Sequence, residues 1–93
     1  MYKITKYSYD RAKELGVIIE PSLRPDKKID VYTKAGQFLV SIGSIGYDDY
    51  GSYLNEYGPA YANERRRLYK IRHNKTRHIV GSKSYWADQI LWS

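Results

Sequence analysis

Two neighbouring segments in which apolar and polar residues alternate restrict the fold of this chain more than any other feature of its sequence. In the first, Ile29 and Val31 alternate with polar or amphipathic neighbours. The second alternates with the same period through Phe38, Val40 and Ile42. A period of two is that of a β-strand, and residues 34–37 between the segments are typical of a tight turn. The pattern predicts a β-hairpin over about residues 28–43.

Helix signals surround this hairpin. Ser8 is a suitable N-cap for a first helix that Gly16 would end. Pro59 suits the first position of the longest helix, which should run to about His73. We expect further short helices at about residues 52–57 and 84–92, with Ser82 or Ser84 as the cap of the last. Between the first helix and the hairpin, residues 17–19 predict only a brief extended run, ended by Pro21.

These elements together predict a small α+β protein with the order α-β-β-α-α. A lone hairpin is at best marginally stable in water, so three to four short helices should pack against it. The length of 93 residues fits a single domain over residues 1–93. Eleven Tyr, two Trp and one Phe must supply much of the buried surface.

Several classes of protein are disfavoured by what the composition lacks. The chain has no cysteine, which excludes disulfides and thiolate metal sites. His73 and His78 are five residues apart and make a poor zinc site, so we expect neither a metal nor another cofactor. The start of the chain lacks the apolar core of a signal peptide, and no stretch approaches a membrane span. We therefore expect an intracellular protein that does not enter a membrane.

The positive charge is unevenly distributed along the sequence. The formal net charge is +6. Residues 65–93 hold eight Lys or Arg against one acid, Asp88, a net charge of +7, and the rest of the chain carries −1. Residues 46–64 hold four acids and no base. This polarity points to a partner that carries charge.

On a helix from Pro59, these cations fall on one side. The side predicted to face the core carries Tyr61, Glu64, Leu68 and Ile71. The opposite side, continued beyond the helix, carries the predicted nucleic-acid-binding residues, with Tyr69 at its edge as a ring that could stack on a base: Arg66, Arg67, Tyr69, Lys70, His73, Lys75 and Arg77. Arg65 and Arg72 flank the apolar side, so we expect them to pair internally with Asp48, Asp49 or Glu56.

Plainer interpretations stand beside these. A cationic helix face is often only solvated, and late Lys or Arg residues also interact favourably with the helix dipole. Residues 41–46 resemble a phosphate-binding loop but lack the lysine and serine of a Walker motif, which favours a simple turn. Asp48 and Asp49 have no recognisable catalytic base or nucleophile beside them, so we do not expect an enzyme. Trp86 and Trp92 suit either the core or a protein–protein contact.

Segments along nearly the whole chain are similar to one family when taken as a set. They are Lys28–Tyr32, Ser41–Gly43, Gly46–Tyr50, Tyr61-Ala62, Arg65-Arg66, Leu68-Tyr69, Arg72-His73 and Tyr85–Trp92. They resemble a family of small uncharacterised proteins, a domain of unknown function, encoded by large DNA viruses of algae and other protists. The resemblance implies a viral origin and carries over no active-site residue.

Two functional hypotheses follow. The first is a small basic viral accessory protein that binds DNA or RNA through its cationic C-terminal helix. The second is a minor structural or assembly protein of a virus particle, which contacts other viral proteins through its aromatic residues and its charge polarity. The sequence does not distinguish DNA from RNA, and it leaves the oligomeric state open.

Overall fold

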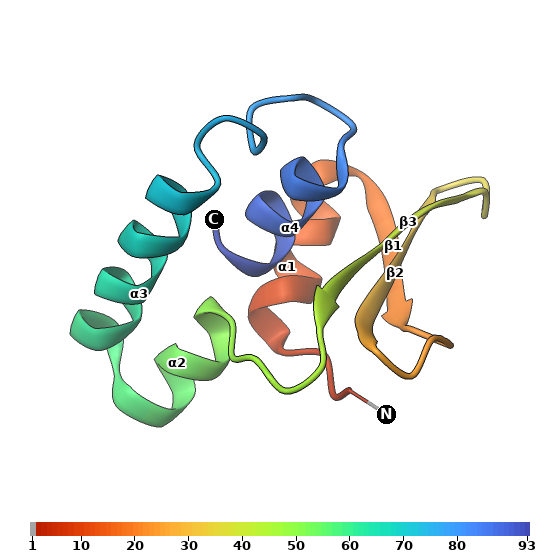
Figure 1. The fold of residues 1–93 in the computed structure, drawn as a ribbon. Coiled ribbons are helices and arrows are strands. Elements are labelled where there is room, and N and C mark those ends of the chain that lie inside the picture. Colours follow the sequence, from red (N-terminus) through yellow and green to blue (C-terminus); the bar gives the residue numbers. More distant parts are fainter. Residues whose placement is uncertain (1) are drawn as a thin grey trace. The chain divides into compact units, whose positions relative to one another are not determined.

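The computed structural model describes residues 2–93 and shows an α+β fold with three strands and four helices (Figure 1). The element order is α-β-β-β-α-α-α, so the predicted class is confirmed, with one strand and one helix more than the order predicted. The chain divides into two compact units, which we describe separately: the N-terminal unit ends at Tyr47 and the C-terminal unit is Asp48–Ser93. That these form a single domain stays a prediction.

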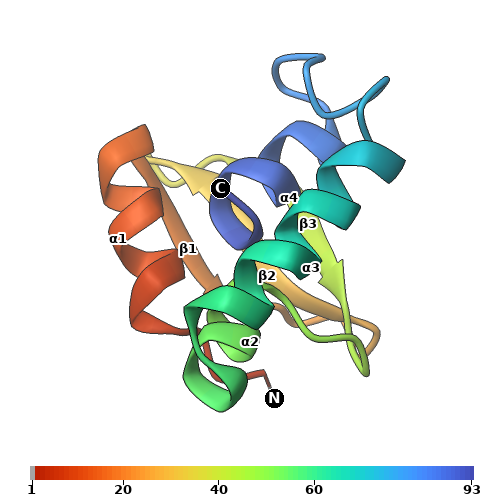
Figure 2. The ribbon, with the colours of Figure 1, turned by 90° about the vertical axis from the view of Figure 1, so that its left-hand side faces the viewer.

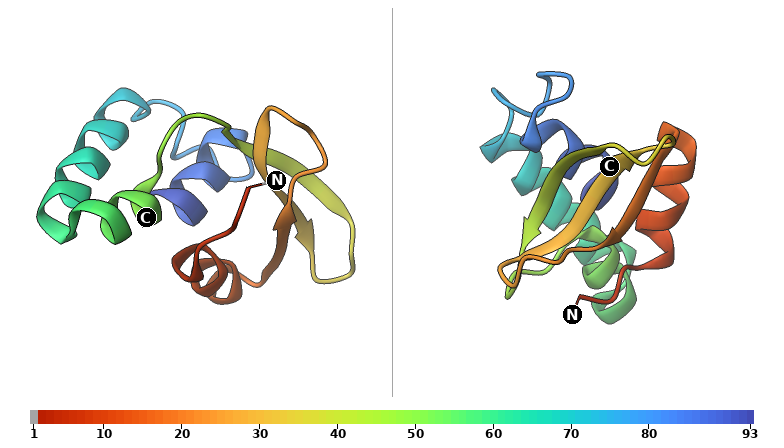
Figure 3. Two further views of the ribbon diagram at one scale, coloured as in Figure 1. Left: turned by 90° about the horizontal axis from the view of Figure 1, so that it is seen from below. Right: turned by 90° about the vertical axis from the view of Figure 1, so that its right-hand side faces the viewer.

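The N-terminal unit is built on an antiparallel sheet in the order β1-β2-β3, with β2 in the middle (Figure 3, right). Strands β2 (Lys27–Thr33) and β3 (Phe38–Ser44) form the predicted hairpin, and residues 34–37 connect them. Gly36 takes a φ of +88° in this turn, a conformation that favours glycine. The brief extended run after the first helix is strand β1 (Val17–Pro21), which pairs with β2 along its whole length. Its Pro21 is tolerated because β1 is an edge strand.

A β-bulge interrupts the alternation of the hairpin. Val31 lies opposite Val40, but the next residue, Tyr32, lies opposite Phe38, so Leu39 has no partner on β2. The Tyr32 and Phe38 rings meet edge to face, with centroids 5.8 Å apart. The predicted alternation of β3 is therefore broken between Phe38 and Val40, and Phe38 is exposed.

The sheet carries both apolar and charged buried side chains. Ile29, Val31 and Ile42 are fully buried, as their positions in the alternation predicted. Asp30, also buried, accepts 2.6 Å hydrogen bonds from the hydroxyls of Ser22 and Ser41, and a third from the backbone N–H of Leu23. Burial raises the pKa of Asp30, but the three hydrogen bonds outweigh burial and leave that pKa below its usual value.

Helix α1 (Lys6–Leu15) lies beside β1 in the N-terminal unit. It begins three residues before the predicted start, because Thr5 is the N-cap in place of Ser8 and its hydroxyl accepts a hydrogen bond from the backbone N–H of Ser8. Ser8 itself is buried inside the helix. Gly16 ends the helix in the left-handed conformation, as predicted.

The C-terminal unit consists of three helices. Figure 2 shows α2 (Tyr50–Tyr57) leading into α3 (Pro59–Arg72), and α4 (Lys83–Leu91) beside α3. Asp49 caps α2, Pro59 stands at the start of α3, and the Ser82 hydroxyl caps α4, the last two as predicted. Among residues 2–93, no helix is long and apolar enough to cross a bilayer.

Candidate functional site

Helix α3 turns a different side to the interior than its sequence pattern predicts. Its buried residues are Ala62 and Tyr69. Leu68 and Ile71, which were predicted to face the core, are 38% and 61% exposed. The prediction of the core-facing side is therefore wrong: the buried side of α3 is nearly opposite to it.

The reason is an aromatic stack that the apolar pattern of α3 does not reveal. The Tyr69 ring lies parallel to Trp92, with an interplanar angle of 6° and centroids 4.5 Å apart, and His73 stacks nearby at 4.3 Å from Tyr69. Trp92 also lies 6.1 Å from Tyr53 of α2. The large rings of Tyr69 and Trp92 outweigh Leu68 and Ile71 as buried surface, so they decide which side of α3 faces inward.

The predicted stacking of Tyr69 on a base needs an accessible ring, and the expectation that this ring is accessible is wrong. Only 9% of Tyr69 is exposed. Burial, reinforced by the Asp88 carboxylate, raises the pKa of the Tyr69 phenol to about 12. His73 is half-buried against the same ring. Between Trp92 and His73, the Tyr69 ring presents no free face of the kind that stacks on an unpaired base.

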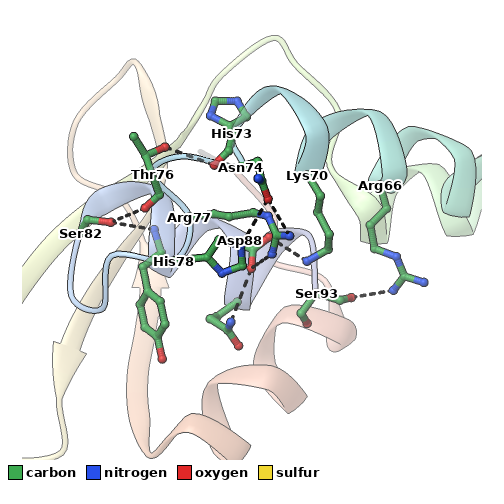
Figure 4. Close-up of polar contacts among 12 residues, drawn as sticks. Arg66, Lys70, His73, Asn74, Thr76, Arg77, His78, Ser82, Asp88 and Ser93 are labelled. Atoms are coloured by element: carbon green, nitrogen blue, oxygen red, sulfur yellow. Dashed lines mark hydrogen bonds and ion pairs between the residues drawn. The ribbon is translucent and has the colours of Figure 1, made fainter.

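Arg66 is held by contacts within the C-terminal unit (Figure 4). Its guanidinium lies 4.4 Å from the centre of the Tyr50 ring. It also donates hydrogen bonds of 2.9 Å to the Ser93 carbonyl oxygen and of 3.0 Å to Asn63 Oδ1. Arg66 therefore connects α2, α3 and the residues after α4, where the sequence predicted a solvent-facing cation.

Lys70 and Arg77 share one buried carboxylate, that of Asp88 on α4. Lys70 Nζ donates to Asp88 Oδ1 at 2.7 Å, and Arg77 Nη1 lies 3.8 Å from Asp88 Oδ2 (Figure 4). Asp88 is 2% exposed, so its charge needs these partners. The trio ties α3 and the segment between α3 and α4 to α4. We name Lys70, Arg77 and Asp88 the Asp88 cluster.

Arg67 is exposed but paired. Its Nε and Nη2 atoms donate to the two carboxylate oxygens of Glu64 at 3.0 and 2.6 Å, a bidentate arrangement one helical turn apart. These hydrogen bonds raise the pKa of Arg67 and lower that of Glu64. The pair neutralises the middle of the outer side of α3.

The remaining cations lie toward the end of α3 and beyond it. Lys75, a predicted nucleic-acid contact, is exposed, and so is Arg72. Within residues 2–93, neither Arg65 nor Arg72 forms an ion pair, so their predicted pairing with nearby acids is wrong. Arg65 instead lies over the Tyr53 ring, 5.4 Å from its centre. His78 contacts Asn74 Oδ1 at 3.3 Å.

The charge polarity of the sequence is weaker in the folded units. The acidic residues 46–64 belong almost entirely to the same unit as the basic residues after them. Each unit contains eight Lys or Arg and five Asp or Glu, a net charge of +3 for each. The excess charge is therefore shared between the units and is not concentrated in one.

The outer side of α3 presents apolar and aromatic side chains to solvent. Ile71 and Leu68 lie there with Tyr61, and the ring of Tyr57, at the end of α2, is 4.7 Å from that of Tyr61. We name Tyr57, Tyr61, Leu68 and Ile71 the α3 stripe. Sequence reasoning found three of these residues on one side of the helix but placed that side in the core. The sequence pattern of α3 does not reveal the stack of Tyr69 on Trp92, because Trp92 is 23 residues away along the chain.

Comparisons with known proteins add no assignment to this geometry. No family model matches the chain, and neither a search of curated proteins nor one of solved structures found a match. Within residues 2–93 there is also no group of three His, Asp or Glu side chains that could hold a metal ion. The resemblance to the viral family stays a prediction.

Proposed function

We propose that this chain is a small assembly protein that acts through protein–protein contacts made by the α3 stripe. The observation that carries the proposal is the orientation of α3. Its apolar side chains face solvent, while most of the cations predicted to bind phosphate are engaged by the protein's own groups: Arg66, Arg67, Lys70 and Arg77. This reverses the order in which the sequence ranked the two hypotheses.

The exposed side chains provide a physical reason for association. Burying a Leu, Ile or aromatic side chain contributes roughly 1.5–3 kcal/mol when burial is complete. Ile71 and Tyr57 are more than half exposed, so most of that gain is still open to a partner. Aromatic side chains are also enriched at the energetically important centres of interfaces. The resemblance to viral proteins makes other proteins of a particle the natural partners.

A photoreactive amino acid placed at residue 68 tests the proposal in cells that express the chain. We expect cross-links from this position to protein, and we expect Ile71→Glu to remove them because it puts a charge into the stripe. The matched control carries the photoreactive residue at position 80, since Val80 is 79% exposed but lies outside the stripe. Cross-linking at residue 68 that is no stronger than at residue 80 would refute the proposal.

Nucleic-acid binding is the second candidate, and the cations at the end of α3 favour it. Arg72 and Lys75 are exposed, and within residues 2–93 neither pairs with a carboxylate. They could contact phosphates without disrupting the fold. In this account Lys75 remains a candidate contact, while Arg66, Lys70 and Arg77 serve mainly to hold the C-terminal unit together.

A salt titration distinguishes these roles. If Arg72 and Lys75 each contact a phosphate, replacing both by Ala should flatten the plot of log affinity against log salt by about two units. The double variant Arg66→Ala/Lys70→Ala should instead lower stability. No measurable binding to DNA or RNA at low salt would eliminate this second candidate.

A further inference from the structure

We propose that the α3 stripe docks onto the same stripe of a second copy of this chain, with the two α3 helices antiparallel. This inference rests on the proposed function, because it names the partner of the same surface. It commits to a symmetric contact in which each copy contributes the same residues. The argument comes from the distribution of charge and side-chain size along α3.

The two ends of the stripe differ in charge. At one end, the exposed Tyr57 ring lies near carboxylates: Glu56 is the main cause of its raised pKa, with smaller contributions from burial, Tyr61 and Asp48. At the other end, beyond Ile71, stand the exposed cations Arg72 and Lys75. A parallel pair of helices would place like charges together. An antiparallel pair brings the acidic end of each copy to the basic end of the other.

The spacing of the stripe fits such a pair. When two α3 helices run antiparallel about an axis near residue 66, Tyr61 of one copy faces Ile71 of the other. In the same register Leu68 faces the aliphatic stem of Glu64, whose carboxylate is already paired with Arg67. Tyr57 and Lys75 lie beyond the two ends of α3, so the same register brings the acidic end of one copy near the basic end of the other. Within α3, every large side chain of the stripe has a partner.

The size of the contact predicts its strength. A helix of 14 residues is about 21 Å long. One face of such a helix buries less than the roughly 1,200 Å² of a standard stable interface. We therefore expect a weak dimer whose population rises with protein concentration and falls with added salt. Weak contacts of this kind suit a protein that functions in many copies.

Sedimentation equilibrium on the purified chain measures this association. We expect the wild type to shift from monomer toward dimer as its concentration rises toward about 1 mM, the range in which weak contacts are populated. Ile71→Glu should weaken the association at least tenfold, since its carboxylate would be buried against Tyr61. Val80→Glu makes the same change of charge outside the stripe and should leave the association unchanged. Circular dichroism checks that both variants are folded.

Disulfide trapping tests the orientation, because the chain has no cysteine of its own. One preparation carries Tyr61→Cys and another carries Ile71→Cys. Under mild oxidation, the antiparallel register predicts that mixed 61–71 disulfides form faster than 61–61 or 71–71 disulfides. Preferential formation of the two like disulfides would overturn the antiparallel arrangement.

The outcomes separate this inference from the proposed function. A monomer at all concentrations, with no preferred disulfide, overturns the dimer. If residue 68 still cross-links to a different protein in cells, the proposed function survives with another partner. If residue 68 cross-links to nothing, both fail. Cross-links from residue 68 to residues 2–47 of the same chain would also overturn the dimer, because the stripe would then be covered from within.

Discussion

Asp88→Asn removes the negative charge that faces two cations in the C-terminal unit, and its cost can be worked out from the structure. Breaking a buried ion pair by removing one partner typically costs 3–5 kcal/mol. The side chains of Lys70 and Arg77 keep 28% and 20% of their exposure, so both can turn partly toward water. We therefore expect Asp88→Asn to lower the free energy of unfolding by about 2–3 kcal/mol, which is less than the full cost of breaking a completely buried pair.

Urea denaturation followed by tryptophan fluorescence and circular dichroism measures this loss. In a chain of this length, 2–3 kcal/mol corresponds to a decrease in Tm of roughly 10–20 °C. Glu64→Gln is the matched control, because it removes a carboxylate from an exposed pair with Arg67 and should cost less than about 1 kcal/mol. The double variant Lys70→Met/Asp88→Asn should cost less than the sum of the single variants, because the two side chains interact directly.

Comparing the costs of Asp88→Asn and Glu64→Gln tests whether Asp88 holds Lys70 and Arg77 in place. If Asp88→Asn is no more costly than Glu64→Gln, then Lys70 and Arg77 do not depend on Asp88. Both cations would then be free to meet phosphate, as the sequence predicted. A large cost for Asp88→Asn with unchanged affinity for nucleic acid would support the structural role that we assign to the Asp88 cluster.

Three further predictions concern pH and backbone conformation. The pKa of Asp30 is lowered by folding, so the stability that its hydrogen bonds contribute should be present above its ordinary pKa of 3.8 and be lost as the pH falls through the lower folded value. The double variant Ser22→Ala/Ser41→Ala should therefore unfold in acid at a higher pH, as measured by circular dichroism. An unchanged midpoint would contradict this. The pKa of Tyr69 is raised from 10.0 to about 12, so the contribution of its neutral phenol to stability should be complete below pH 10 and be lost as the pH rises toward 12. Absorbance at about 295 nm, the tyrosinate band, should show one late-titrating tyrosine in the wild type that is absent in Tyr69→Phe. Gly58 joins α2 to α3 with φ of +87° and ψ of 174°, a region of backbone conformation that is essentially restricted to glycine, and a Cβ there would meet no atom within 4 Å. Gly58→Ala should therefore lower the free energy of unfolding by about 1–3 kcal/mol through backbone strain alone. A neutral effect in thermal denaturation would contradict this geometry.

Local signals explain which parts of the fold could be predicted from the sequence. The turn at residues 34–37, the start of α3 at Pro59 and the cap at Ser82 each depend on residues within one or two turns of each other. Strand β1 was harder, because residues 17–21 are too few to show a period and only their pairing with β2 makes them a strand. The bulge at Leu39 likewise depends on how two strands meet.

The candidate site could not be predicted for a related reason. The number of cations in α3 was visible, but their partners lie far away in the sequence: Asp88 for Lys70, and the Ser93 carbonyl for Arg66. Leu68 and Ile71 were placed inside because they are apolar, whereas the Tyr69 ring, which can stack on Trp92, takes that position. Hydrophobic periodicity treats tyrosine as an ambiguous residue, and in a chain with eleven of them the period loses much of its meaning.

The orientation of α3 underlies both the proposed function and the inferred dimer, and hydroxyl-radical footprinting tests it most directly. In dilute protein, we expect Tyr61 and Leu68 to be oxidised faster than Tyr69 and Trp92. At high concentration, Tyr61 and Leu68 should become protected while Tyr69 stays unchanged. Rapid oxidation of Tyr69 together with slow oxidation of Leu68 in dilute protein would contradict the account, because the cationic side of α3 would then face solvent.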